Sequence, residues 1–149
     1  MEFSITIPAD NDGYALFQCS FCGEFFKITP DDFEDDSILE LCCPACALIS
    51  DTYFTNDVLD LAMAKASNYA MDIVHKEFKK LERQFSSGIV SFKAGNKPNE
   101  DHENPIRATI DAMVELGYSC CNKSIKVKPL LQITGSYCPF CGVKSFETK

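Results

Sequence analysis

The sequence predicts an α+β fold, with two small, cysteine-rich β modules joined by a long α-helix and a second, shorter helix. Two observations lead to this prediction. The nine cysteines lie in four clusters, two toward each end of the chain, and the stretch between them carries apolar residues at helical spacing. We expect residues 1–54 to form the first module, 55–103 the long helix with a strand and a loop, and 104–149 the second helix with the second module. With 149 residues, 46% of them hydrophobic, the chain is long enough to bury a core.

The cysteine usage and the first residues of the chain bear on its location. The first residues lack the basic and apolar regions of a secretory signal, and no apolar run reaches the ~20 residues that span a bilayer. We therefore expect a cytoplasmic protein without a membrane segment. In a reducing cytosol, an odd number of clustered cysteines indicates metal ligands rather than disulfides.

The first module is predicted to be a small sheet that holds one metal ion. Cys19-Ser-Phe-Cys22 and Cys43-Pro-Ala-Cys46 are separated by 20 residues, close to the ~15–20 residues typical of zinc sites built from two CxxC pairs. Each CxxC turn, or knuckle, offers two thiolates to a tetrahedral metal ion, and Gly23 suits the positive φ that commonly follows a knuckle. We expect strands in residues 2–7, 14–18, 25–29 and 37–42, and an acidic loop over 30–36.

Residues 57–85 carry the pattern of one long helix. Apolar side chains from Leu59 to Phe85 recur mostly at three- or four-residue steps, which places them on one face. At 1.5 Å per residue the helix is roughly 43 Å long, so its apolar face must pack on more than one small module. Alanines without a regular heptad favour packing within the chain. A homodimer through this helix is the alternative.

Beyond the long helix, the chain is predicted to form a short strand over 89–93 and then a loop over 94–103. This loop is rich in Gly, Pro and Asn, and we expect it to be a domain boundary or a flexible insert. The segment from Asn104-Pro105 to Gly117 has the start and stop signals of a second helix. Residues 124–128 alternate polar and apolar side chains, which is typical of a strand.

The second module repeats the knuckle scheme with one departure. Cys138-Pro-Phe-Cys141 matches the second knuckle of the first module, and the segment after Cys121 aligns with the segment after the first knuckle. On this alignment Tyr118 stands where the first module has Cys19. One thiolate is therefore missing from the pattern.

The missing ligand is expected to be Cys120, the immediate neighbour of Cys121, with 16 residues between Cys121 and Cys138. Adjacent ligands strain the turn but can reach one metal ion. His102, His75 or a water molecule are the alternatives.

Cys42 is then the ninth thiol. We expect it to be a strand residue that faces the core; in the alternative it exchanges with Cys43 as a ligand. The expected ligands of the two metal ions are Cys19, Cys22, Cys43, Cys46, Cys120, Cys121, Cys138 and Cys141.

The residues from about 3 to 50 and from 118 to 147 resemble the zinc-ribbon superfamily, which includes ribbons of general transcription factors and of RNA polymerase subunits. The resemblance rests on the CxxC knuckles described above. It implies two zinc ribbons with one zinc ion each, and folding that is coupled to metal binding. Because zinc ribbons bind nucleic acids, dock on proteins or serve as structural modules, the resemblance does not select a function.

The charge is strongly polarised along the chain. Residues 1–60 carry 13 acidic side chains and one basic one, whereas residues 61–149 carry 9 acidic and 13 basic ones. The acidic first module does not suit phosphate binding, which depends on Lys and Arg. The nucleic-acid candidates are Lys76, Lys79, Lys80, Arg83, Lys126 and Lys128. Cations at a helix C-terminus are also favoured by the helix dipole, so a solvated basic face is the simpler interpretation.

The sequence indicates no catalytic machinery. His75 and His102 have no associated Ser or Asp pattern, and a zinc site with four thiolates leaves no position for an activated water. We therefore expect no enzymatic activity. A second site with only three thiolates would be open to water and would make hydrolysis or deamination conceivable.

Three functional hypotheses remain. The leading one is a zinc-binding adaptor or scaffold that docks on a partner protein or complex. The second is a nucleic-acid-associated factor that uses the basic helix end, residues 76–83, and the second ribbon. The third is a rubredoxin-like electron carrier, because paired CxxC knuckles can also hold iron.

Overall fold

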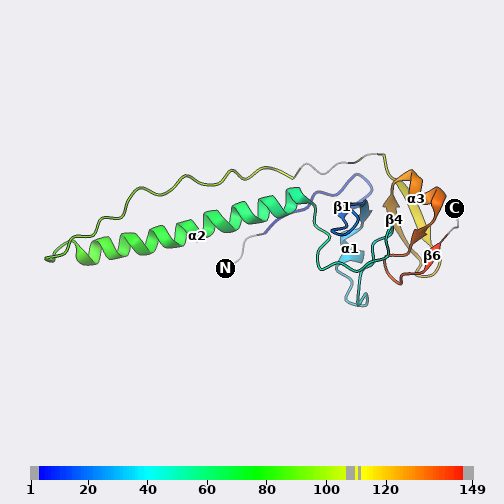
Figure 1. Cartoon of the computed structure of the whole chain (residues 1–149), viewed down its shortest axis with the longest axis horizontal. Coiled ribbons are helices and arrows are strands. Elements are labelled where there is room, and N and C mark those ends of the chain that lie inside the picture. The colour runs from blue at the N-terminus through cyan, green and yellow to red at the C-terminus, as the bar shows by residue number, and fades with distance from the viewer. Residues whose placement is uncertain (1–3, 107–109, 111, 146–149) are drawn as a thin grey trace. The chain divides into compact units, whose positions relative to one another are not determined.

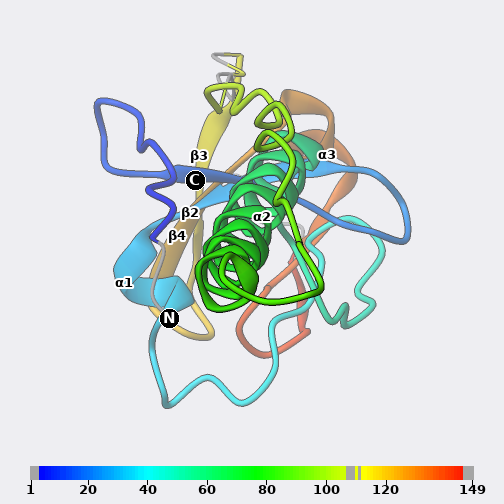
Figure 2. The same cartoon turned by 90° about the vertical axis from the view of Figure 1, so that its left-hand side faces the viewer.

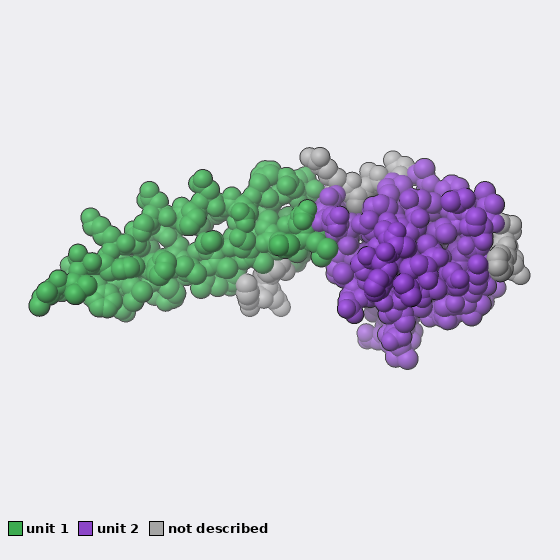
Figure 3. Space-filling view, viewed as in Figure 1, with its two compact units in different colours: residues 1–5, 59–105 green, residues 6–58, 106–149 purple. Residues whose placement is uncertain are grey.

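A computed structural model describes residues 4–106, 110 and 112–145, and its mixture of helices and antiparallel strands confirms the α+β class. The chain forms two compact units (Figures 1 and 3). The helical unit comprises residues 1–5 and 59–105, and the ribbon unit comprises residues 6–58 and 106–149. The division expected from the sequence after residues 54 and 103 stays a prediction.

The ribbon unit is built on one antiparallel sheet with the strand order β1-β2-β4-β3. The neighbouring strands β2, β4 and β3 are labelled in Figure 2. The strands are β1 (Ala15–Gln18), β2 (Phe25–Ile28), β3 (Val114–Tyr118) and β4 (Lys123–Val127). Strands from both ends of the chain therefore share one sheet, with β2 and β4 at its centre. The side chains of Phe26, Ile28, Ile125 and Val127 on these central strands are fully buried and form the middle of the core.

Each central strand leads into a short helix that begins with proline. The acidic loop expected over 30–36 begins instead with α1 (Pro30–Phe33), and α3 (Pro129–Thr134) follows β4. Proline suits the first helical position because that position needs no N–H donor. A two-stranded sheet of β5 (Ser136–Tyr137) and β6 (Lys144–Ser145) completes the unit.

The two halves of the ribbon unit are related by an internal pseudo-two-fold symmetry. The Cys42 N–H donates to the Pro139 carbonyl oxygen at 2.8 Å, and the Tyr137 N–H donates to the Pro44 carbonyl oxygen at 2.8 Å. Residues 42 and 137 each stand directly before a knuckle, and residues 44 and 139 are each the second residue of a knuckle. The two hydrogen bonds therefore join equivalent positions of the two halves. The halves thus meet through equivalent surfaces, as two subunits of a symmetric dimer would.

The main elements of the helical unit are α2 (Asn56–Phe85), whose first three residues belong to the ribbon unit, and the segment of residues 86–105. This stretch, here named the extended segment, runs back along α2 (Figure 1). The helix confirms the prediction for residues 57–85. The Asn68 side chain accepts the Asp101 N–H at 2.7 Å and donates to the Asp101 carbonyl oxygen at 3.0 Å. An ion pair between Lys97 and Asp72 also ties the segment to α2. The predicted loop over 94–103 is therefore attached to the helix.

The predicted second helix over 104–117 is wrong. Its described residues 104–106, 110, 112 and 113 form no helix, and its end is strand β3; residues 107–109 and 111 lie outside the described residues. In β3, Leu116 and Tyr118 are buried and alternate with exposed neighbours, which is a strand pattern. Pairing with β4 outweighs the local helix signals.

Three predicted strands are also wrong. The described part of the first, residues 4–7, forms no strand, and neither do residues 89–93. Over 37–42 only Cys42 pairs, in a single bridge with Ile49. Alternation alone does not make a strand, because a strand needs a partner to satisfy its backbone groups. Strands β1, β2 and β4 lie where the sequence predicts them.

Within the described part of the chain, no helix is long and apolar enough to cross a membrane.

Candidate metal centres

The first group of cysteines has the geometry of a tetrahedral metal site. The Sγ atoms of Cys19, Cys22, Cys43 and Cys46 all lie within 4.8 Å of one another. The Cys19 and Cys46 sulfurs are 3.8 Å apart and the Cys22 and Cys43 sulfurs 3.6 Å apart. Four thiolates bound at about 2.3 Å to one ion stand about 3.8 Å from each other. This group, the Cys19 centre, could hold one metal ion.

The knuckles bring these sulfurs together through one repeated turn. In the first knuckle, the Gly23 N–H donates to the Cys19 carbonyl oxygen at 3.0 Å; in the second, the Ala47 N–H donates to the Cys43 carbonyl oxygen at 2.9 Å. The residue that follows the second cysteine of each pair has positive φ throughout the ribbon unit. These four residues are Gly23, Ala47, Asn122 and Gly142, with φ of 75°, 61°, 52° and 78°. The prediction for Gly23 is confirmed.

The second group of cysteines comes from the C-terminal part of the ribbon unit, residues 120–141. The Sγ atoms of Cys120, Cys121, Cys138 and Cys141 also lie within 4.8 Å of one another, and those of Cys120 and Cys141 are 3.4 Å apart. The structure thus brings Cys120 to the predicted group. Neither described histidine belongs to either group of four. This group, the Cys120 centre, could hold a second metal ion.

Tyr118 occupies the place that the first cysteine of a knuckle would take. It pairs with Lys123 across the β3–β4 hairpin, as Cys19 pairs with Glu24 through a 3.0 Å hydrogen bond from its N–H. The Tyr118 side chain is buried, and its hydroxyl lies 2.7 Å from the hydroxyl of Ser136. The phenol therefore fills the position inside the sheet, and the fourth sulfur comes from Cys120 at the tip of the turn.

Burial controls the ionisation of the most enclosed thiols. It is the main cause that raises the pKa of Cys43 and of Cys138. Burial also opposes ionisation of Cys19, but hydrogen bonds from the backbone N–H groups of Cys22 and Phe21 and from the neighbouring thiols together outweigh it and lower the pKa of that thiol. The Val143 N–H is the main cause that lowers the pKa of Cys141. Both centres thus contain a deeply buried thiol whose thiolate requires a cation beside it.

Comparison with known proteins adds no relative. No protein-family model, no curated protein and no solved structure matches the chain. The likeness to zinc ribbons therefore rests on the two groups of four cysteines and on the turns that position them.

Cys42 belongs to neither group of four. Its side chain is half-buried, and its sulfur lies 3.7 Å from where a Cβ on Gly142 would stand, beside the Cys120 centre. Its exchange with Cys43 stays a prediction.

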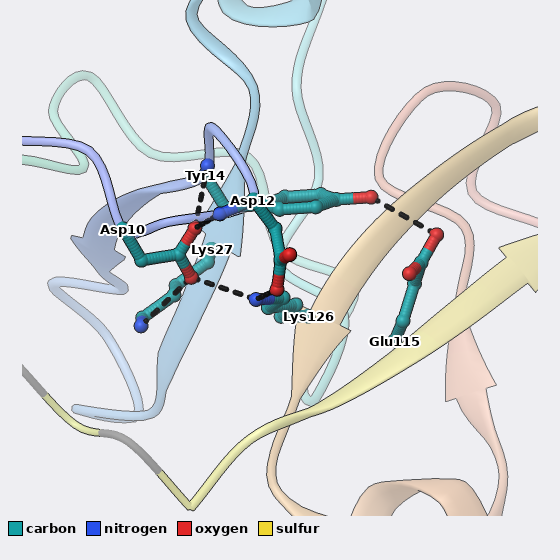
Figure 4. Close-up of polar contacts among 6 residues, drawn as sticks. All are labelled: Asp10, Asp12, Tyr14, Lys27, Glu115 and Lys126. Atoms are coloured by element: carbon teal, nitrogen blue, oxygen red, sulfur yellow. Dashed lines mark hydrogen bonds and ion pairs between the residues drawn. The ribbon is translucent and has the colours of Figure 1, made fainter.

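Two of the nucleic-acid candidates are engaged within the ribbon unit. Lys126 forms ion pairs with Asp10 at 2.8 Å and with Asp12 at 2.6 Å, and its side chain is only 12% exposed (Figure 4). Lys128 lies 2.7 Å from Glu24. Asp10, Asp12 and Glu24, which no sequence motif marks, neutralise these two ammonium groups and leave little positive charge for a phosphate.

The other basic candidates lie near the end of α2. Lys76, Lys79 and Arg83 are exposed and line an open hollow of the helix surface together with Ile73 and His75. Lys80, beside them, forms an ion pair with Glu77 at 2.7 Å. The basic end of the helix therefore remains accessible in the helical unit.

The side of α2 that faces away from the extended segment is apolar. Residues on a helix are ~100° apart around the axis, so Lys65, Asn68 and Asp72, which contact the segment, share one side. The opposite side carries exposed large apolar side chains, here named the α2 apolar face. They are Leu59, Met63, Val74 and Leu81. The extended segment contacts α2 at Lys65, Asn68 and Asp72 and through the Phe92 ring at Phe78, and it leaves the α2 apolar face exposed.

Proposed function

We propose that the protein is a zinc-binding, non-enzymatic adaptor that docks on a partner protein or complex. The observation that carries the metal assignment is the pair of four-cysteine groups, each with its sulfurs within 4.8 Å. Four thiolates in a tetrahedral arrangement favour zinc, and such a site has no open position for a reacting water. The expected role of both ions is to hold the ribbon unit together.

Zinc would complete the core of the ribbon unit. The two deeply buried sulfurs, Cys43 and Cys138, lie at the centre of the unit with 0% exposure and belong to its hydrophobic cluster. Removing the cations would leave clustered thiols in place of metal–sulfur bonds. Folding of the ribbon unit is therefore expected to depend on the metal.

The α2 apolar face supports the docking role. Met63 is 71% exposed and Val74 46% exposed in the helical unit, and a row of large apolar side chains along one side of a helix is a common protein-binding surface. A partner that lays a complementary apolar groove or helix on this face would bury it. A second copy of the chain is the alternative occupant.

Elemental analysis of the purified full-length chain tests the metal assignment. We expect two zinc ions per chain, and one or none after Cys43→Ser. The matched control Cys42→Ser should keep both. A wild-type protein that contains no zinc would contradict the proposal, and a red iron-bound protein from iron-replete, anaerobic cultures would favour the electron carrier instead.

Co-purification from the native host tests the docking role. We expect a stoichiometric partner that is lost with Leu81→Glu and retained with Leu130→Glu, the same substitution at an exposed position in α3. Zinc content should be unchanged in both variants. A partner that binds both variants equally would contradict docking through the α2 apolar face, and a chain that purifies alone or only self-associates through α2 would contradict the adaptor.

Nucleic-acid binding is the second candidate, favoured only by the accessible basic end of α2. Phosphate contacts by Lys76, Lys79, Lys80 and Arg83 would give an affinity that falls steeply with salt. Reversal of all four to Glu should abolish such binding. Binding that is unchanged by this reversal would exclude the basic end as the site.

A further inference from the structure

We propose that the two metal centres differ in lability, with the Cys120 centre exchanging its ion readily and the Cys19 centre retaining it. The inference rests on the proposed function to the extent that both centres must hold zinc. It assigns a distinct role to each: a permanent structural ion in the first half of the ribbon unit and an exchangeable one in the second.

The pseudo-two-fold symmetry allows the two centres to be compared position by position. The second knuckles are equivalent in their backbone bonds. The Cys43 N–H donates to Leu48 at 3.0 Å, the Cys138 N–H donates to Val143 at 2.8 Å, and Gly142 closes its turn as Ala47 does. Two ligands of each centre therefore occupy the same framework, and any difference must come from the first knuckles.

The first knuckles differ in where the fourth sulfur is attached. Cys19 is 1% exposed, and its backbone is held within the turn by hydrogen bonds to Glu24 and from Gly23. In the second half Tyr118 fills this buried position. Cys120 stands instead where the first half has Phe21, an exposed residue at the tip of the knuckle. The fourth ligand of the Cys120 centre is thus attached at the exposed tip of the turn, whereas the equivalent ligand of the Cys19 centre is attached at a buried position of the sheet.

This difference in attachment changes the access of solvent to the ion. The Cys19 centre has two buried sulfur ligands, one half-buried and one exposed; the Cys120 centre has one buried, one half-buried and two exposed. Exposed thiolates are the ones that water, protons and competing ligands reach first. The Cys120 centre is therefore the one at which an incoming chelator can begin ligand exchange.

The adjacency of Cys120 and Cys121 adds to this difference. Two neighbouring residues must both turn their sulfurs to one ion, whereas a CxxC knuckle presents its sulfurs from one relaxed turn. A site less well matched to tetrahedral geometry binds its metal less tightly. The adjacent ligands predict weaker metal binding at the Cys120 centre, and its exposed sulfurs predict faster metal release from it.

Metal-release kinetics of the zinc-loaded full chain test the inference. With excess 4-(2-pyridylazo)resorcinol we expect one equivalent of zinc to be released at least tenfold faster than the other. Iodoacetamide labelling after the fast phase should modify Cys120 and Cys121 while Cys19 and Cys43 stay protected, as read by mass spectrometry.

Two variants assign the phases. Cys120→Ser should remove the fast phase and leave one slowly released equivalent, whereas Cys42→Ser should keep both phases. The double variant Tyr118→Cys, Cys120→Phe gives the second half the cysteine arrangement of the first half. Its fast phase of zinc release should slow until its rate approaches that of the slow phase. If the double variant does not fold, wild type and Cys120→Ser still decide the outcome.

The possible failures are distinguishable. Two equivalents leaving at one rate, or a fast phase that labels the Cys19 centre, would overturn the inference while leaving the proposed zinc-binding function intact. Wild-type protein without zinc would overturn both.

Discussion

Lys27 and Lys126 lie directly opposite each other in the β2–β4 pair, and one carboxylate, that of Asp10, binds both. The Lys27 ammonium is 3.2 Å and the Lys126 ammonium 2.8 Å from the same Asp10 oxygen (Figure 4). Like charges directly opposite each other destabilise a strand pair. Burial opposes ionisation of Asp10, but hydrogen bonds from Lys126, the Tyr14 N–H and Lys27 outweigh it and hold the pKa of this carboxyl well below its usual range.

Asp10→Asn should therefore destabilise the ribbon unit by about 2 kcal/mol, because a nearly buried Lys27, with 4% of its side chain exposed, would lose its counter-charge. Urea unfolding of the zinc-loaded protein measures the change. Asp36→Asn, at an exposed acidic position, is the control and should leave the midpoint unchanged. Equal midpoints for wild type and Asp10→Asn would show that this carboxylate does not hold the sheet together.

Tyr53→Phe should alter the dependence of stability on alkaline pH. Burial is the main cause that raises the pKa of Tyr53 to about 12, whereas the unfolded phenol ionises near 10. Stability from the neutral phenol is thus fully present below pH ~10 and is lost as pH rises toward 12. The variant should lose less stability over this interval in denaturant titrations.

At neutral pH the same variant should cost about 1 kcal/mol, because the Tyr53 hydroxyl accepts the Ser50 N–H at 3.0 Å and donates to the Leu41 carbonyl oxygen at 2.5 Å, with the Leu48 carbonyl oxygen 3.2 Å away. Tyr69→Phe, at a more exposed tyrosine, serves as the control and should follow the wild-type pH profile. A Tyr53→Phe profile parallel to wild type would contradict the raised pKa.

Ala47→Gly should stabilise the zinc-loaded protein by about 0.5 kcal/mol. Ala47 has a φ of 61°, a conformation that costs a residue with a Cβ about 1 kcal/mol, part of which the greater freedom of an unfolded glycine offsets. Thermal unfolding measures the effect. Ala45→Gly, two residues earlier in the same knuckle and without positive φ, should be destabilising; a gain of stability in both variants would refute the explanation.

Asn68→Ala should release the extended segment from α2. Its side-chain amide makes two hydrogen bonds with the Asp101 backbone and one with the Glu103 carboxylate at 3.2 Å. Because these bonds are exposed, we expect a local loss of about 1 kcal/mol. The measurement is hydrogen exchange of the Asp101 amide, expected to become several-fold faster. Asn96→Ala is the control. Unchanged exchange would mean that other contacts hold the segment.

The features that the sequence predicts are those with a local signature. The CxxC spacing predicts the Cys19 group and the Cys138–Cys141 knuckle, because each knuckle is a short turn that depends only on neighbouring residues. Cys120 is predicted differently, as the thiol beside Cys121 that replaces the ligand missing from the pattern. The 3.6-residue period predicts α2 to within one residue at its start. Neither result requires knowledge of distant contacts.

The features that it does not predict depend on partners far along the chain. Val114, Leu116 and Tyr118 satisfy a strand pattern, but Asn104-Pro105 and Gly117 supply helix boundaries, and only pairing with β4 decides between them. The two halves likewise form one sheet because β2 pairs with β4, and no local sequence pattern predicts that pairing.

The placement of β2 between β1 and β4 constrains the order in which the protein can assemble during its synthesis. Lys27 of β2 and its partner Lys126 of β4 are 99 positions apart in the chain, so at ~5–20 residues per second β2 waits roughly 5–20 s for its central neighbour. Throughout that interval the nascent first ribbon displays an unpaired strand edge with Phe26 and Ile28. The four cysteines of the Cys19 centre are all made by residue 46, so the metal ion proposed for this centre could bind before the sheet is complete, and early metal loading would then stabilise the new ribbon until the last third of the chain emerges.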